Sequence, residues 1–92
     1  MIKSFRHKGI ERFFRKGDVR GIQTRQAGRI LRILDLLDEA GNAGQLNIPG
    51  YGLHTLRGDR KGEWAMSVSG NWRITFKFED EDAIDVNLED YH

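Results

Sequence analysis

The sequence predicts an α+β fold in which two N-terminal helices pack on a small, mainly antiparallel β-sheet. Two observations support this class. Apolar residues recur at helical spacing up to residue 40, whereas after residue 63 they alternate with polar residues in three short runs. The length of 92 residues and the apolar fraction of 38% fit one domain, residues 1–92, with a single modest core.

The first helix is predicted from residue 8 to residue 16. Its apolar residues fall at positions i, i+3 and i+4 of one face, namely Ile10, Phe13 and Phe14. Gly17 is expected to end it, because glycine readily adopts the backbone conformation that closes a helix. The preceding residues 2–7 alternate loosely and predict a short N-terminal strand. His7 is expected to be an exposed polar residue.

The second helix is predicted over residues 23–40. Its apolar stripe comprises Ala27, Ile30, Leu31, Leu34 and Leu37. Thr24 is expected to cap the N-terminus, and Gly41 with Asn42 is expected to stop the helix. A loop should follow, because glycine and the single proline gather there.

The loop covers residues 41–52 and is expected to hold one helical turn at residues 43–46. His54 lies at the start of a strand-like segment. Three longer strands are predicted beyond it, at residues 64–69, 72–78 and 84–89. Gly70 and Asn71 form the hairpin turn between the first two. The alternation predicts an antiparallel meander with one apolar face against the helices and one open polar face.

Strand parity assigns individual side chains to these two faces. Arg73 alternates with apolar neighbours, and Tyr91 continues the polar positions of the last strand, so both are expected on the open face. Trp64 and Trp72 have the opposite parity. They are most simply core residues, although an aromatic ring can also stack on an RNA base.

Charge is segregated along the chain although the net charge is only +1. Residues 1–37 contain ten Lys and Arg against three acidic residues, whereas residues 78–92 contain seven acidic residues and no Lys or Arg. This distribution suits a polyanionic partner that contacts one side of the molecule. No cysteine is present, which excludes disulfides and thiolate metal sites. Without a long apolar run or a signal-peptide pattern, the protein is expected to be soluble and cytoplasmic, with no membrane partner.

Three arginines of the second helix, Arg25, Arg29 and Arg32, repeat at i, i+4 and i+7 opposite the apolar stripe. Such a row is often only a solubilising face. It also matches a surface that grips RNA, because guanidinium groups contact phosphate in a bidentate manner. The sequence alone leaves both interpretations open.

Four residues together match the chemistry of RNA cleavage: His54, Arg57, Arg73 and His92. RNA supplies its own nucleophile, the ribose 2′-OH. A protein therefore needs a base for that hydroxyl, an acid for the leaving 5′-oxygen, and cations for the phosphoryl oxygens. Histidine suits the first two tasks because its pKa is about 6.5, and arginine suits the third because it is always charged.

Each of these residues also has a structural explanation. His54 is compatible with a packing role, and His92 with a frayed chain end. Arg73 is compatible with a cross-strand ion pair to Asp85 or Glu89. Spacing along the chain does not show whether the four side chains meet.

Several motifs resemble one bacterial family. They are Leu53-His54-Thr55-Leu56-Arg57-Gly58-Asp59, Asn71-Trp72-Arg73-Ile74 and the terminal Asp90-Tyr91-His92. These motifs, together with the opening Ile2-Lys3-Ser4-Phe5, are similar to those of the HigB toxins of toxin–antitoxin operons, within the RelE/ParE superfamily. The resemblance covers essentially the whole chain and implies the RelE-like version of the α+β fold.

The resemblance also implies an activity and its partners. Members of this family are ribosome-dependent endoribonucleases that cut mRNA in the A site of the 70S ribosome and so block translation. A cognate helix-turn-helix antitoxin, HigA-like, neutralises them, and only the toxin–antitoxin complex binds operator DNA. No cofactor or metal is implied.

The resemblance assigns roles to individual residues. His54 and His92 would be the acid and base, Arg73 would stabilise the scissile phosphate, Tyr91 would position the nucleotide, and Asp90 would orient its neighbours. Arg25, Arg29 and Arg32 would rest on ribosomal RNA.

Two positions depart from the family pattern, which usually has His-Pro-Leu-Lys where this chain has His54-Thr55-Leu56-Arg57. Arg57 can still stabilise phosphate charge, but it cannot give up a proton. Thr55 frees the backbone beside His54.

Two other functions remain compatible with the sequence. One is a gyrase inhibitor like the ParE toxins, although such proteins generally lack the terminal histidine. The other is a non-catalytic module that binds an antitoxin and acts with it in operon autorepression. No helix-turn-helix pattern is visible in this chain, so DNA binding by the free protein is not expected.

Overall fold

The computed structural model describes residues 1–91. Within them, the α-helices are α1, Lys8–Lys16, and α2, Ala27–Glu39, and a four-stranded antiparallel sheet has the order β1-β2-β3-β4. The strands are β1, His54–Thr55; β2, Trp64–Ser69; β3, Trp72–Glu79; and β4, Asp82–Asp90. Short 3₁₀ helices occur at η1, Thr24–Gln26; η2, Ala43–Leu46; and η3, Gly58–Arg60. The predicted α+β class and the antiparallel meander are confirmed.

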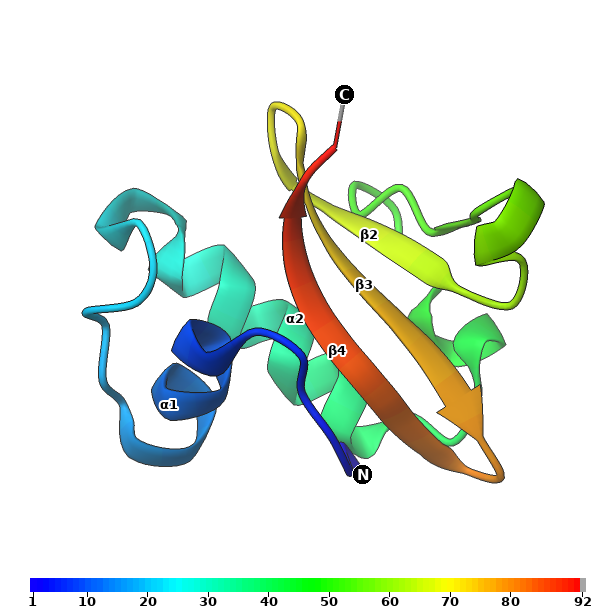
Figure 1. Cartoon of the computed structure of the whole chain (residues 1–92), viewed down its shortest axis with the longest axis horizontal. Coiled ribbons are helices and arrows are strands. Elements are labelled where there is room, and N and C mark those ends of the chain that lie inside the picture. Colours follow the sequence, from blue (N-terminus) through cyan, green and yellow to red (C-terminus); the bar gives the residue numbers. More distant parts are fainter. Residues whose placement is uncertain (92) are drawn as a thin grey trace.

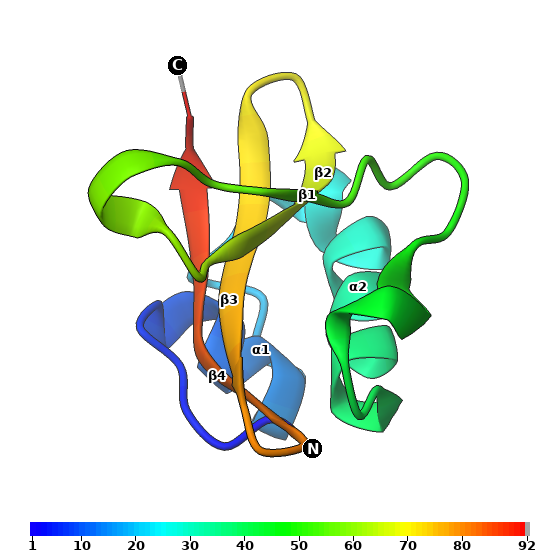
Figure 2. The same cartoon turned by 90° about the vertical axis from the view of Figure 1, so that its right-hand side faces the viewer.

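The sheet lies between two layers of unequal size. Both α-helices lie on one side of it (Figure 1), and the segment that carries β1 and η3 crosses the opposite face (Figure 2). The C-terminal end of β4 lies beside the β2–β3 turn (Figure 1). Neither α-helix of residues 1–91 has the length and apolarity to cross a membrane.

Helix α1 has the predicted bounds, and Gly17 ends it with φ of 71° and a hydrogen bond from its N–H to the Phe13 carbonyl. His7 differs from the prediction. It is half-buried and is the N-cap, because its Nδ1 accepts a hydrogen bond of 3.1 Å from the Ile10 N–H. Desolvation lowers the pKa of His7, so the neutral ring that can accept this bond is favoured.

The N-terminal segment does not form a continuous strand. It meets β4 through two isolated parallel bridges, Ile2 to Ala83 and Phe5 to Val86. The N–H groups of Lys3 and Arg6 each donate a bond of 2.8 Å to the carbonyls of these β4 residues. The prediction of strand-like pairing is therefore correct in kind, but the segment is too irregular to extend the sheet as a full strand.

Helix α2 begins later than predicted. Thr24 is the first residue of η1 and does not cap α2. No side chain caps the start of η1 or of α2. Leu31, placed by sequence in the apolar stripe, is 40% exposed, and Ile33 is buried instead. The buried face runs through Ile30, Ile33, Leu34 and Leu37. Leu31 lies outside it because each residue turns the helix by about 100°.

A bulge changes which side chains of β4 face the helices. Between Thr75 and Lys77 the register to β4 shifts, so that Ile84 pairs with Lys77 on the polar face. Asp85 has φ of 53° at this bulge. The parity prediction for Ile84 is therefore wrong, and Ala83, fully buried, takes the core position.

Parity predicted that the polar face of the sheet would be open, but part of this face is covered. Thr75 is fully buried on it, and its hydroxyl donates a bond of 2.6 Å to Glu89. The segment with η3 covers this part of the sheet, because Arg60 forms ion pairs with both Glu63 and Glu89. The other face packs on the helices, where Phe76 is the largest fully buried side chain.

Candidate active site

The polar face of the sheet brings together four side chains near the C-terminal end of the chain. His54 lies opposite Ala65 of β2, Ser67 lies opposite Arg73 of β3, and Tyr91 follows the end of β4. We refer to His54, Ser67, Arg73 and Tyr91 as the polar cluster. Three of them were predicted from sequence. Ser67 was not, because a serine in an alternating strand carries no distinguishing signal.

His54 is half-buried, and one ring nitrogen is engaged. Its Nδ1 lies 2.8 Å from the Gly52 carbonyl oxygen. A carbonyl oxygen can only accept a hydrogen bond, so Nδ1 carries the proton. In the neutral ring, Nε2 then has the lone pair and is available to take a proton from another group.

Arg73 makes two contacts within the polar cluster. Its Nη1 donates a bond of 3.0 Å to the Ser67 hydroxyl, and its guanidinium carbon lies 5.6 Å from the centre of the Tyr91 ring. Its Nε is buried and has no hydrogen-bond partner in the described part of the chain.

No carboxylate of residues 1–91 lies within ion-pair distance of the Arg73 guanidinium. The ion pair with Asp85 or Glu89 that sequence left open is not formed, because Glu89 is held by Arg60 and Thr75. The positive charge of Arg73 is thus available for an anion.

The Arg60 cluster, which we define as Arg60, Glu63, Glu89 and Thr75, was not predicted. Arg60 donates to Glu63 at 2.9 Å and to Glu89 at 2.6 Å. Hydrogen bonds from Arg60 hold the pKa of both carboxyl groups below the usual range. The spacing of Arg60 and Glu63 is visible in the sequence, but the long-range partner Glu89 is not.

Arg57 is exposed and lies just before η3, on the same segment as His54. Together with Lys61 it borders a shallow pocket that also contains Trp64. Trp64 is half-buried and packs against the core, and Trp72 does the same, so the prediction that both are core residues holds only in part.

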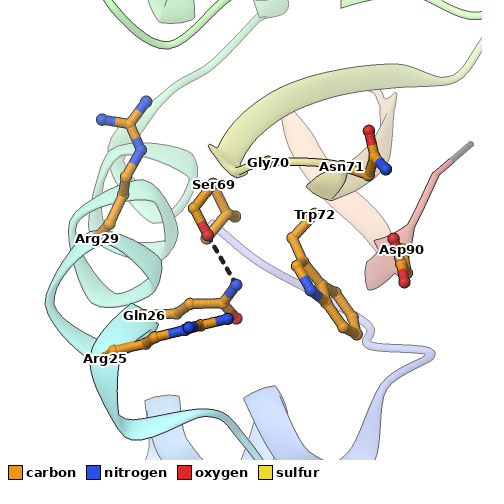
Figure 3. Close-up of a pocket in the computed structure, with 9 residues that line it drawn as sticks. Arg25, Gln26, Arg29, Ser69, Gly70, Asn71, Trp72 and Asp90 are labelled. Atoms are coloured by element: carbon orange, nitrogen blue, oxygen red, sulfur yellow. Dashed lines mark hydrogen bonds between the residues drawn. The ribbon is translucent and has the colours of Figure 1, made fainter.

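Asp90 points to the other side of the sheet from Tyr91. It pairs with Trp72 and lines a pocket between the start of α2 and the β2–β3 turn (Figure 3). Gln26 closes the pocket. It is 3% exposed and donates from Nε2 to the Ser69 hydroxyl at 2.8 Å. The structure therefore separates Asp90 from the polar cluster, although the two residues are adjacent in sequence.

The three arginines of the predicted basic row are not equivalent. Arg25 and Arg32 are exposed, and Arg25 points across the pocket towards Trp72 (Figure 3). Arg29 also lines this pocket, but its guanidinium group points away from Trp72 (Figure 3) and donates from Nη2 to the Gly50 carbonyl at 2.6 Å. The prediction of three outward guanidinium groups is thus wrong for Arg29, which sequence could not show because its partners lie in a distant loop.

His92, one of the two predicted acid–base residues, lies outside the described residues. Among residues 1–91, no group of three or more His, Asp or Glu side chains is arranged to hold a metal ion.

Comparison with known proteins gives two matches. The family model for the RelE-like toxin of the type II toxin–antitoxin system HigB matches residues 3–92. A relative from Proteus vulgaris, Endoribonuclease HigB, is 48% identical over 92 residues, which is 100% of both chains.

Proposed function

The chain belongs to the family of RelE-like HigB toxins of type II toxin–antitoxin systems and is an endoribonuclease, and we propose that it cuts mRNA in the ribosomal A site. The cut blocks translation. A toxin of such a system has an antitoxin partner. The observation that carries the proposed site is the Arg73 guanidinium, free of any described carboxylate, on the same face as the free Nε2 of His54.

The reaction needs no group beyond the RNA and the protein. A base removes the proton of the 2′-OH, the 2′-oxygen attacks phosphorus, and the bond from phosphorus to the 5′-oxygen breaks. An acid then gives a proton to that oxygen. The products are a 2′,3′-cyclic phosphate and a 5′-hydroxyl, and the proton taken by the base balances the proton given by the acid.

His54 suits the base role, because the bond to Gly52 leaves Nε2 of its neutral ring unprotonated. His92, assigned by resemblance, supplies the acid. Arg73 stabilises the charge on the phosphoryl oxygens with its guanidinium group, which no carboxylate of residues 1–91 neutralises. Tyr91, whose ring is near Arg73, positions the nucleotide.

Two further residues act at the margins of this site. Arg57 is exposed and supplies a second cation to the phosphate backbone. Asp90 keeps a role in orienting its neighbours, and it does so from the opposite side of the sheet, where it pairs with Trp72.

The proposed partners are those that the family resemblance implies. Arg25 of η1 and Arg32 of α2, both exposed, contact ribosomal RNA, and this contact weakens with salt. The antitoxin carries the helix-turn-helix, and operator DNA is bound only by the complex of toxin and antitoxin.

The test is cleavage of a defined mRNA by the purified protein, with and without 70S ribosomes that hold a tRNA in the P site, mapped by primer extension. We expect cuts confined to the A-site codon and dependent on the ribosome. Arg73→Ala and His92→Ala should remove them. Arg15→Ala is the matched control, because Arg15 is exposed on α1 and its contacts are with Glu11 and the Phe5 ring, neither of which belongs to the polar cluster.

Two other outcomes would overturn the proposal. Cleavage of free RNA at the same rate would exclude the dependence on the ribosome. A folded protein that arrests growth without any cleavage would point to gyrase, and a supercoiling assay would then decide.

A further inference from the structure

Arg29 joins α2 to the loop that precedes β1. Its Nη2 donates to the Gly50 carbonyl at 2.6 Å and its Nε donates to the Ser67 carbonyl at 3.0 Å. Its guanidinium carbon also lies 4.2 Å from the centre of the Tyr51 ring. The guanidinium is therefore fixed in three directions by groups that lie within the protein.

These bonds complete the edge of β2. Strand β1 pairs with β2 only at Trp64 and Ala65. Beyond that point, the Ser67 N–H donates to the Tyr51 carbonyl at 2.7 Å, and the Ser67 carbonyl accepts from Arg29. In an antiparallel strand, the N–H and C=O of one residue point to the same edge. Arg29 thus satisfies a carbonyl that a longer β1 would otherwise bind.

The loop fixed in this way holds His54. Gly52 lies two residues before His54 and accepts the hydrogen bond from its Nδ1. Gly52 also packs closely on Ser67, since a Cβ atom at this position would lie 3.0 Å from the Ser67 hydroxyl oxygen. Its φ of 59° favours glycine as well.

The same serine holds Arg73, because the Ser67 hydroxyl accepts the bond from Nη1. The backbone of Ser67 is fixed by Arg29 and Tyr51, and its side chain orients Arg73. One residue of β2 therefore links the position of the base to the position of the phosphate-binding cation.

We propose that Arg29 is a positioning residue of the cleavage site: it clamps residues 50–52 onto the edge of β2 and, through Gly52 and Ser67, sets the places of His54 and Arg73. This inference rests on the proposed function. Arginine is required because its planar fork reaches two carbonyl oxygens at once and stacks on a ring, whereas lysine has a single ammonium group.

The experiment compares Arg29→Met with Lys16→Met in single-turnover cleavage of ribosome-bound mRNA. Lys16 is the matched control, because it is exposed at the end of α1, its replacement also removes one positive charge, and it is not among the catalytic or RNA-contacting residues. We expect Arg29→Met to lower the rate constant at saturating protein by roughly 10- to 100-fold, as for other small misplacements of catalytic groups. The half-saturating concentration should stay within twofold, and Arg29→Lys should recover only part of the rate.

A second measurement separates positioning from general stability. The ¹⁵N chemical shifts of the His54 ring, in the full chain without ribosomes, report which nitrogen carries the proton. We expect Nδ1–H in the wild type and in Lys16→Met, and a mixture of tautomers in Arg29→Met. Ser67→Ala, which removes only the hydroxyl bond to Arg73, should lower the rate without changing the tautomer.

The outcomes distinguish the two proposals. If wild type does not cleave, the proposed function fails. If wild type cleaves and Arg29→Met instead raises the half-saturating concentration at an unchanged rate constant, Arg29 contacts ribosomal RNA and the positioning role is overturned. An unchanged His54 tautomer in a folded Arg29→Met would overturn it as well.

Discussion

The two described histidines show how one bond decides the role of a residue. His7 accepts a hydrogen bond at Nδ1 from a backbone N–H, whereas His54 has the same atom at a carbonyl oxygen. Nδ1 is therefore unprotonated in His7 and protonated in His54. Sequence identified His54 and Arg73 as candidates by residue type. It could not give the tautomer, because that depends on Gly52, whose carbonyl direction is set by the loop contacts.

A pH dependence of stability follows from His7. Its pKa in the folded protein lies below its ordinary value of 6.5, so it contributes stability above pH 6.5 and loses it as the pH falls through the folded-state pKa. His7→Asn, which keeps a capping acceptor, should remove this part of the pH dependence. His7→Ala should lose about 1 kcal/mol at pH 7.5, the usual worth of a cap. Urea unfolding at pH 5.5 and 7.5 measures the pH dependence and the loss of the cap. If the wild type and His7→Asn lost the same stability between pH 7.5 and pH 5.5, His7 would not be the source of the pH dependence.

At the scale of elements, sequence succeeded where structure is local. The bounds of α1 and of the turn at residues 43–46 match because apolar spacing and glycine act within a few residues. The face of Ile84 was missed because a bulge shifts β4 against β3. This bulge at Asp85 is held by a bond of 2.8 Å from its N–H to the Ser4 hydroxyl, a partner 81 residues away.

The attachment of η3 gives a second prediction. Arg60→Met leaves the carboxylates of Glu63 and Glu89 close together without their cation, and should cost about 2–4 kcal/mol of unfolding free energy at pH 7. The pKa of both groups is lowered by Arg60, so their contribution is present above pH 4.5 and is lost as the pH falls further. The variant should therefore lose less stability than wild type between pH 5 and pH 3. Unfolding in guanidinium chloride at pH 5 and pH 3 measures the two free energies. If the wild type and Arg60→Met lost the same amount of stability between these pH values, the prediction would be contradicted.

At the scale of the whole molecule, the candidate site lies where the last strand ends, beside the β2–β3 turn (Figure 1). Parity correctly placed Arg73 and Tyr91 on one face. It could not show that the segment with η3 covers the same face further along, because that contact depends on ion pairs between distant parts of the chain.

The chain end can be tested without disturbing this architecture. Removal of His92, or addition of a bulky C-terminal tag, should abolish A-site cleavage, because the proposed acid is lost or blocked. The melting temperature should change by less than about 2 °C, since β4 already ends at Asp90 and surface changes rarely exceed 0.5 kcal/mol. Antitoxin binding in a pull-down should persist. Full cleavage by the shortened chain would remove His92 from the catalytic set.

The pairing of the N-terminal segment with β4 has a consequence for folding during synthesis. Residues 2 and 5 are made well before their bridge partners, Ala83 and Val86, which lie far along the chain. One edge of β3 also stays unpaired until β4 has been made, because β4 is its partner at that edge. The nascent chain therefore cannot close its sheet while its C-terminal part is still inside the exit tunnel. A toxin built in this order becomes competent only after β4 has emerged from the exit tunnel of the ribosome that made it.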